Sequence, residues 1–178
     1  MPDQYPFYDR DKFPELKYIE SQWKVIRDEA MEYKDDFYPI EDPRNYKGWS
    51  AMPLKPEADD INFQGMFNEE LVARRDMWKD KFPYTRSICD SIENEGYVFS
   101  CLAPLGHIKP RIHEEKHVST LMGLDLGDNC IFKVGNSTKE IKAGEFLVFD
   151  YQIPHTAWNL SNKDRVALVV VLKNKYKD

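Results

Sequence analysis

Several features that mark other protein classes are scarce or missing in this chain of 178 residues. Its three cysteines form no Cys-x-x-Cys pair, which argues against a disulfide framework or a zinc ribbon and favours reduced, buried thiols. No apolar run approaches the roughly 20 residues of a membrane span, and the first residues lack the basic and apolar regions of a signal peptide. The net charge is −6, without a dense lysine and arginine cluster. We therefore expect a cytoplasmic protein with no membrane span and no nucleic-acid partner.

The composition that is present is typical of a globular protein, with 42% apolar, 31% charged and 13% aromatic residues. A chain of this length can bury a sizeable core, so we expect a single domain over residues 1–178. Residues 1–95 are predicted to form a helical and irregular portion that packs on a β-rich core over residues 96–178. The sequence carries no signal for the oligomeric state.

The N-terminal portion is predicted to contain three helices and a loop. The first helix begins near Pro14, because apolar residues recur at spacings of three and four: Leu16, Ile19, Trp23, Ile26, Ala30 and Tyr33. Residues 37–66 hold several prolines and no clear period, and are expected to form an extended, packed loop. A second helix is expected from about Asn68 through Trp78 until Pro83 interrupts it. A short third helix carries Ile88, Cys89 and Ile92.

After Gly96 the pattern changes to short strands separated by turn signals. Six segments are rich in β-branched or aromatic residues: 97–103, 118–126, 130–134, 138–142, 146–149 and 166–173. Strands at this regular spacing are typical of a β-sandwich or barrel. The last segment is apolar at every position from Val166 to Leu172, so we expect it to lie centrally in the sheet, covered by the N-terminal helices.

Two separate parts of the chain offer metal-binding side chains. Three of the four histidines, among them His113, lie within eleven residues, and His155 follows farther along. Two histidines and one carboxylate form the facial triad of non-heme Fe(II) oxygenases. His113 and Glu115 are alternate residues that can point the same way from an extended backbone. With His155 they would complete such a triad; the ordinary alternative for Glu115 is a solvated loop charge, and for His107 and His117 a surface or satisfied core histidine.

One arginine lies close in sequence to one of these histidines. Arg165 follows His155 by ten residues, where a polar turn gives way to the apolar last strand. An unpaired cation is costly there, and an arginine can clamp the distal carboxylate of a diacid through two parallel hydrogen bonds. The pair therefore indicates a metal together with a dicarboxylate.

The pattern as a whole resembles a known family. The segments that carry the resemblance are 99–110, 122–124, 130–134, 144–150 and 155–158, with Arg165. Together they resemble the aspartyl/asparaginyl β-hydroxylase family, which includes lipid A acyl-chain hydroxylases. Residues 23–29 and 82–85 are similar to its N-terminal portion, so the resemblance spans most of the chain and is most specific from Gly144 to Arg165.

This resemblance implies a double-stranded β-helix core, of the jelly-roll or cupin-like kind, with N-terminal helices. It also implies a hydroxylase, a dioxygenase dependent on Fe(II) and 2-oxoglutarate, that acts on an unactivated C–H bond of an amino acid, peptide side chain or small metabolite. By the family's pattern, His155 would bind iron, and Arg165 with Ser100 would hold the far carboxylate of 2-oxoglutarate. The partner is then a small-molecule or peptide substrate.

Two positions depart from the family's pattern. The family's first iron histidine directly follows a proline, but here Arg111 follows Pro110, and the nearest imidazole is that of His113. The family's second arginine falls on Ser119, and Arg111 or Lys116 could replace it. Many family members bind iron with two histidines and no protein carboxylate, so both this arrangement and the triad with Glu115 stay open.

Other readings of the same residues are a differently metallated cupin-like enzyme and a non-catalytic cupin-like binding protein. The first would lack the arginine clamp, and the second would not depend on a metal. Residues 35–65 are expected to line the substrate entrance, with four candidate contacts: Tyr38, Tyr46, Trp49 and Met52.

Overall fold

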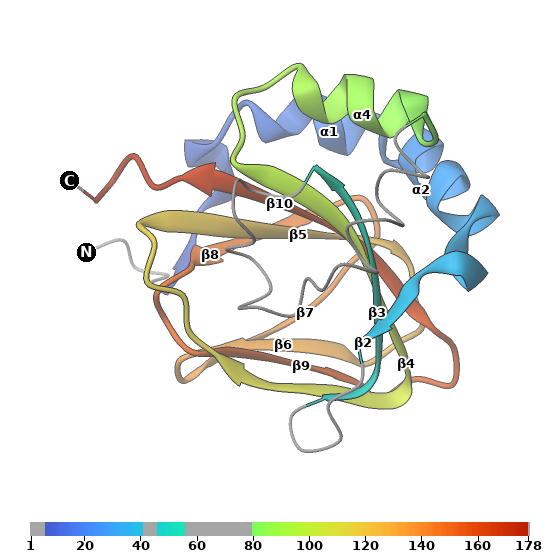
Figure 1. Ribbon diagram of the computed structural model, residues 1–178. Helices are drawn as coiled ribbons and strands as arrows, with labels where there is room; N and C mark the ends of the chain where they lie inside the picture. Colours follow the sequence, from blue (N-terminus) through green and yellow to red (C-terminus); the bar gives the residue numbers. More distant parts are fainter. Residues whose placement is uncertain (1–5, 41–45, 56–79, 178) are drawn as a thin grey trace.

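The computed structural model describes residues 6–40, 46–55 and 80–177, and its main feature is a sheet that curls into a nearly closed barrel (Figure 1). The strands are β1 (Phe7–Tyr8), β2 (Tyr38–Ile40), β3 (Tyr46–Lys55), β4 (Gly96–Arg111), β5 (His117–Asp125), β6 (Cys130–Val134), β7 (Ser137–Glu140), β8 (Phe146–Asp150), β9 (His155–Asn159) and β10 (Arg165–Lys173). Within the described residues they form one antiparallel sheet in the order β1-β8-β5-β10-β4-β9-β6-β7, with β3 beside β4 and β2 beside β3. The six expected strands are all present, and the expected double-stranded β-helix is confirmed.

The long strand β4 connects the two sides of the barrel. Its first part pairs with β10 and its second part with β9. It turns from one side to the other near Leu105, which has a left-handed backbone (φ 59°). At the next residue, Gly106, a Cβ atom would lie 2.7 Å from the carbonyl oxygen of Ala103, so only glycine fits this turn. One strand thus contributes side chains to both walls of the interior.

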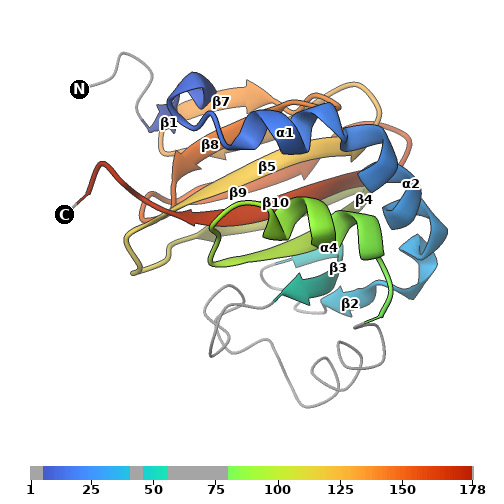
Figure 2. The ribbon, with the colours of Figure 1, turned by 90° about the horizontal axis from the view of Figure 1, so that it is seen from above.

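Helices cover one outer face of the barrel. Figure 2 shows α1 (Leu16–Ser21), α2 (Trp23–Glu32) and α4 (Pro83–Asp90) over β5, β10 and β4. Short 3-10 turns, Arg10–Lys12 and Lys34–Asp36, flank α1 and α2. Along β10, Leu168 and Val170 pack into the helix-side core, whereas Ala167 belongs to the core inside the barrel and Val169 packs against that core. Both faces of β10 are therefore buried, which explains its uninterrupted apolar sequence and confirms its expected central place.

The prediction of a loop over residues 37–66 is wrong where the structure describes it, because β2 and β3 lie there. The prolines that suggested a loop are tolerated: Pro39 is in the outermost strand β2, and Pro53 lies where the pairing of β3 with β4 shifts register. Tertiary pairing with β4 supplies the order that the local sequence does not indicate. The helix expected from Asn68 lies outside the described residues.

The two other helical predictions need correction at their boundaries. The helix expected from Pro14 to Tyr33 is two helices that meet at Gln22, and the break places Trp23 against Gly144. The Trp23 ring lies 2.8 Å from where a Cβ of Gly144 would be. Pro83 begins α4 instead of interrupting a helix, as suits a residue without an N–H at a first turn. No helix of the described segments is long and apolar enough to cross a membrane.

Candidate active site

The interior of the barrel contains a pocket between its two walls. The empty space in it, part of which is open to solvent, amounts to about 660 Å³. Its walls are mostly apolar, and its polar and charged side chains are Trp49, Ser100, Arg111, His113, Ser119, Tyr151, His155, Thr156 and Arg165. Four of the five predicted site residues line this pocket, and Glu115 does not. No aspartate or glutamate is among the described residues that line it.

The two predicted iron histidines come together on one side of the pocket. Their ring centroids lie 5.5 Å apart, with 12° between the ring planes. The His155 Nδ1 atom is 2.9 Å from the carbonyl oxygen of Ile153, so Nδ1–H donates and the Nε2 lone pair is left for a ligand. Burial lowers the pKa of His155 to about 4, so its imidazole is neutral at physiological pH. Neutral imidazole is the form that binds a metal ion.

The loop between β4 and β5 holds His113, and an aromatic ring fixes its imidazole. The His113 ring stacks on Tyr151 with 3.7 Å between centroids and 5° between planes. The backbone N–H of His113 donates to the carbonyl oxygen of Tyr151 at 3.4 Å. Tyr151 is a site residue that the sequence did not assign, although it stands only four residues before His155 in the most family-like segment.

The expected triad is not assembled. Within the described ranges, no three histidine, cysteine, aspartate or glutamate side chains are grouped so as to hold a metal ion. The assumption of an extended backbone fails after Arg111, because residues 112–116 belong to no strand, and alternation no longer aligns Glu115 with His113. His107 and His117 do not line the pocket either. The geometry thus favours the two-histidine arrangement, and a ligand role for Glu115 stays a prediction.

In the lining of the same pocket, a buried guanidinium meets a serine hydroxyl. Arg165 is 1% exposed, and its Nη2 donates to Ser100 Oγ at 3.0 Å. Trp49 Nε1 donates to the same oxygen at 3.0 Å. Since Ser100 Oγ already accepts twice, its own O–H is available to a ligand. The Nε and Nη1 atoms of Arg165 have no hydrogen-bond partner among the described residues.

These unused donors give the site a clear chemical preference. Burial lowers the pKa of Arg165 to about 10, which still leaves the guanidinium charged at neutral pH. A buried cation without an ion-pair partner in the described structure is costly unless an anion joins it. The guanidinium fork and the Ser100 hydroxyl match a carboxylate, whose two oxygens accept several hydrogen bonds.

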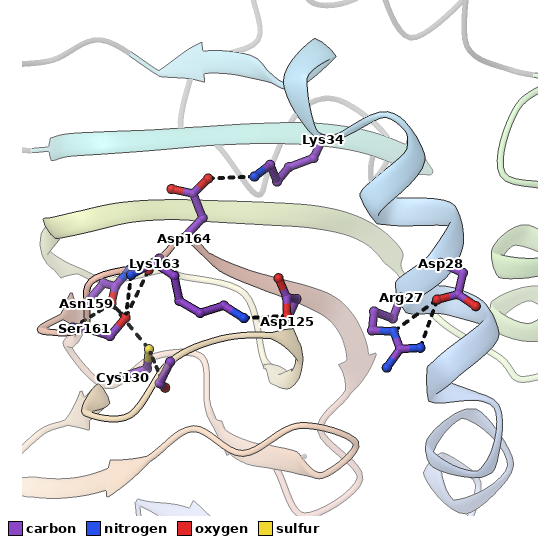
Figure 3. A network of polar contacts seen from close by, with 10 residues as sticks. Arg27, Asp28, Lys34, Asp125, Cys130, Asn159, Ser161, Lys163 and Asp164 are labelled. Atoms are coloured by element: carbon purple, nitrogen blue, oxygen red, sulfur yellow. Dashed lines mark hydrogen bonds and ion pairs between the residues drawn. The ribbon is translucent and has the colours of Figure 1, made fainter.

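The turn before β10 holds Arg165 in place through a polar network (Figure 3). The buried Asn159 side chain donates to the carbonyl oxygens of Leu102 and Lys163, each at 2.8 Å. Lys163 pairs with Asp125 at 2.8 Å, and Asp164 pairs with Lys34 at 2.9 Å. The hydrogen bond to Asp164 is the main cause that raises the pKa of Lys34. The start of β10 is thereby tied to β4, β5 and the end of the helical portion.

A second arginine lies in the pocket, beside the histidines. Arg111 pairs with His155 in the β4–β9 register, and its guanidinium is 5.2 Å from the Trp49 ring centroid. Burial lowers the pKa of Arg111. Lys116, the other candidate for the family's missing arginine, is exposed and does not line the pocket. Of the two, Arg111 is therefore the one that the structure places at the site.

The predicted entrance residues separate into different environments. Trp49 forms part of the pocket wall, and its bond to Ser100 is a polar role that the sequence did not indicate. Tyr46 packs edge-on against Trp49, with 4.9 Å between the ring centroids. Met52 points away from the pocket into the helix-side core. Alternation along β3 explains the difference between Trp49 and Met52, since odd and even positions face opposite sides of a strand. Tyr46 does not follow this alternation, because the pairing of β3 with β4 shifts register between Lys47 and Trp49.

Comparisons with known proteins find a sequence family and distant structural neighbours. A sequence model described as aspartyl/asparaginyl beta-hydroxylase matches residues 20–175. Human aspartyl/asparaginyl beta-hydroxylase is 26% identical over 166 residues, which cover 87% of this chain and 20% of the human protein. Among solved structures, a predicted oxalate decarboxylase from Thermotoga maritima has a TM-score of 0.47 at 17% identity, covering 78% of this chain and 95% of its own. A cupin domain of an XRE family transcriptional regulator from Enterobacter cloacae has a TM-score of 0.45 at 12% identity, covering 71% and 97%. By the extent of the sequence match, the chain belongs to the aspartyl/asparaginyl β-hydroxylase family.

Proposed function

We propose that the protein is an Fe(II)- and 2-oxoglutarate-dependent dioxygenase that hydroxylates an unactivated C–H bond of a small molecule or a peptide side chain. One observation carries the proposal: two imidazoles and a buried guanidinium–serine pair line a single pocket. Such a pocket can bind a metal ion at the imidazoles and a carboxylate at the guanidinium and the serine hydroxyl. Membership of a hydroxylase family supports the same conclusion.

His113 and His155 are the residues that would hold the iron. The hydrogen bond from His155 Nδ1 to Ile153 directs the free Nε2 lone pair toward a ligand. Imidazole nitrogen is a ligand that Fe(II) accepts well, and two protein ligands leave several coordination positions for a chelating keto acid and O₂. Iron supplies the oxygen activation, for which no side chain is suited, and the protein supplies binding and orientation.

Arg165 and Ser100 would anchor the far carboxylate of 2-oxoglutarate. The unused Nε and Nη1 donors of Arg165 and the Ser100 hydroxyl offer charge-assisted hydrogen bonds. The apolar side chains of Leu121, Phe149 and Val169 line the same pocket and suit contact with the methylene groups of the diacid. Anchoring at one end fixes the orientation of the other, which makes the later steps effectively intramolecular.

The proposal is tested by succinate formation from 2-oxoglutarate with added Fe(II), together with Fe(II) binding under anaerobic conditions. We expect His155→Ala to abolish both, because half of the imidazole pair is lost. Arg165→Met should raise the KM for 2-oxoglutarate by about 100-fold, since two to three kcal/mol is typical for hydrogen bonds to a charged group. Arg27→Met, which removes a partly exposed arginine of α2 that does not line the pocket, is the matched control and should behave like the wild type.

The alternatives give different results in these measurements. Fe(II) binding that survives His155→Ala would contradict the proposal and favour a non-catalytic binding protein. A metal-dependent activity that forms no succinate and is indifferent to Arg165→Met would favour a differently metallated cupin-like enzyme.

A further inference from the structure

An ion pair between a buried aspartate and a partly exposed lysine lies at the start of the turn that leads to His155. Asp150, at the end of β8, has a fully buried side chain, and its Oδ2 is 2.6 Å from Lys177 Nζ. Its other oxygen, Oδ1, accepts the backbone N–H of Gln152 at 3.0 Å. Lys177 belongs to the 174–177 segment that follows β10, so this segment is fastened to the turn that joins Tyr151 to His155.

The contact continues from this ion pair to the loop that carries His113. Lys177 Nζ also donates to Gln152 Oε1 at 2.8 Å, and Gln152 Nε2 donates to the backbone carbonyl of Glu114 at 2.7 Å. The amide orientation of Gln152 is fixed by its two partners, since an ammonium only donates and a carbonyl only accepts. Lys177 is thus two contacts away from the backbone carbonyl of Glu114, the residue that follows His113.

The same segment holds the other end of this loop. The backbone N–H of Asn174 donates to the carbonyl oxygen of Lys116 at 3.1 Å. The Asn174 side chain donates to the Tyr8 hydroxyl at 3.2 Å. Residues 112–116 belong to no helix or strand, so they lack the regular ladder that orders β4 and β5. Their conformation therefore depends on individual contacts of this kind.

We propose that Lys177 is a positioning residue for the metal pair: through Gln152 and Asp150 it clasps the His113 loop to the turn that leads into His155. The inference rests on the proposed function for the role of the two histidines, and on the contacts above for the clasp itself. One histidine comes from the loop between β4 and β5 and the other from the first residue of β9, and both must present their nitrogens to one ion. Groups that orient metal ligands from behind typically change metal affinity 10- to 100-fold when they are removed.

The sharpest test is Gln152→Glu, because a glutamate still accepts from Lys177 but cannot donate to the Glu114 carbonyl. Lys177→Met removes the ammonium that joins Asp150 to the Gln152 side chain, and Lys177→Arg retains the charge and its donors. Lys173→Met is the matched control, because Lys173 is an exposed lysine of the same region whose ammonium lies 3.9 Å from Glu93. Two quantities are measured: the dissociation constant of Fe(II) under anaerobic conditions, and hydrogen exchange of residues 112–117 in the metal-free protein.

We expect Gln152→Glu and Lys177→Met to weaken Fe(II) binding about tenfold or more and to speed exchange in residues 112–117. Lys177→Arg should restore both quantities, and Lys173→Met should change neither. A purely structural role would instead give a lower melting temperature with unchanged Fe(II) affinity in the folded protein, and this result would overturn the inference. Unchanged exchange in Gln152→Glu would overturn it as well.

Failure of the proposed function would look different. In that case the wild type would not bind Fe(II) through His155, while exchange in residues 112–117 would still respond to Gln152→Glu. The hydrogen-exchange measurement therefore tests the clasp even if the protein does not bind Fe(II).

Discussion

At the scale of single residues, the site depends on how each polar atom is already engaged. Ser100 can serve a ligand because Trp49 and Arg165 occupy its two acceptor positions and leave its hydrogen to point elsewhere. The Nδ1 atom of His155 is engaged by Ile153, which leaves Nε2 for a ligand. Sequence reasoning found His155 by residue type and position and Ser100 through the family resemblance, but it could not find the neighbours that set their hydrogen bonds.

The bond from Trp49 to Ser100 gives a prediction of its own. Trp49→Phe keeps an aromatic ring for Arg111 but removes the donor to Ser100, so the hydroxyl can turn away from the ligand. One hydrogen bond contributes about 1 kcal/mol, so we expect the KM for 2-oxoglutarate to rise roughly five-fold, with kcat nearly unchanged. Steady-state kinetics of succinate formation would check this, with Tyr46→Phe as the control. An unchanged KM would mean that Ser100 needs no second donor.

The three cysteines also behave as individual residues. All are buried and free, and burial raises the pKa of Cys89 to about 12 and that of Cys101 to about 11. At pH 8 their thiols are therefore protonated, and only the thiolate is the reactive nucleophile. We expect no thiol to react with a disulfide reagent in the native protein and three to react after denaturation, by spectrophotometric titration. Rapid native labelling of one thiol would contradict the burial described above.

At the scale of elements, two kinds of contact hold the turn between β9 and β10, and they differ in how much they stabilise it. Asn159 is buried and its amide bonds to two backbone carbonyls, whereas the Lys34–Asp164 pair keeps 26% and 33% of its side chains exposed. Removing a buried hydrogen-bonding group leaves its partners without a hydrogen bond, which is costly, whereas partly exposed ion pairs contribute little to stability. The turn therefore owes its order mainly to Asn159.

This difference can be measured in two variants. We expect Asn159→Ala to lower the free energy of unfolding by about 2–3 kcal/mol and to raise the KM for 2-oxoglutarate, because Arg165 begins the next strand. Lys34→Met should cost about 1 kcal/mol or less and leave the KM unchanged. Denaturant unfolding with steady-state kinetics would check both; equal losses would show that the ion pair matters as much as the amide.

Elements also show where prediction from sequence succeeds. Strands such as β10 can be predicted from the sequence, because a strand that is buried on both faces has a continuous apolar sequence. The strand β3 and the far half of β4 cannot be predicted in this way, since their order comes from pairing with each other and with β9 across long stretches of chain. The same limit applies to Glu115: alternation holds only inside a strand, and β4 ends before it.

At the scale of the whole molecule, the proposed ligands would join the two walls of the barrel. A ligand that binds only the folded state stabilises it in proportion to the logarithm of its concentration, by about 2.7 kcal/mol at 100 times its dissociation constant. We expect Fe(II) with 2-oxoglutarate, under anaerobic conditions, to raise the melting temperature by several degrees, and a chelator to reverse the shift. In Arg165→Met the metal-dependent part should remain and the 2-oxoglutarate-dependent part should vanish. An equal response of both proteins to 2-oxoglutarate would contradict the anchor.

The pairing of β1 with β8 bears on when the pocket forms during folding. It joins Phe7 to Phe149, and β10 must insert between β4 and β5 before the wall that contains Arg165 is complete. Pairings between residues so far apart in sequence make folding slow, because the entropy of closing long loops is lost before the contacts reward it. The pocket cannot form on a growing chain until β10 has emerged, so the ligand-binding surfaces are assembled together and late.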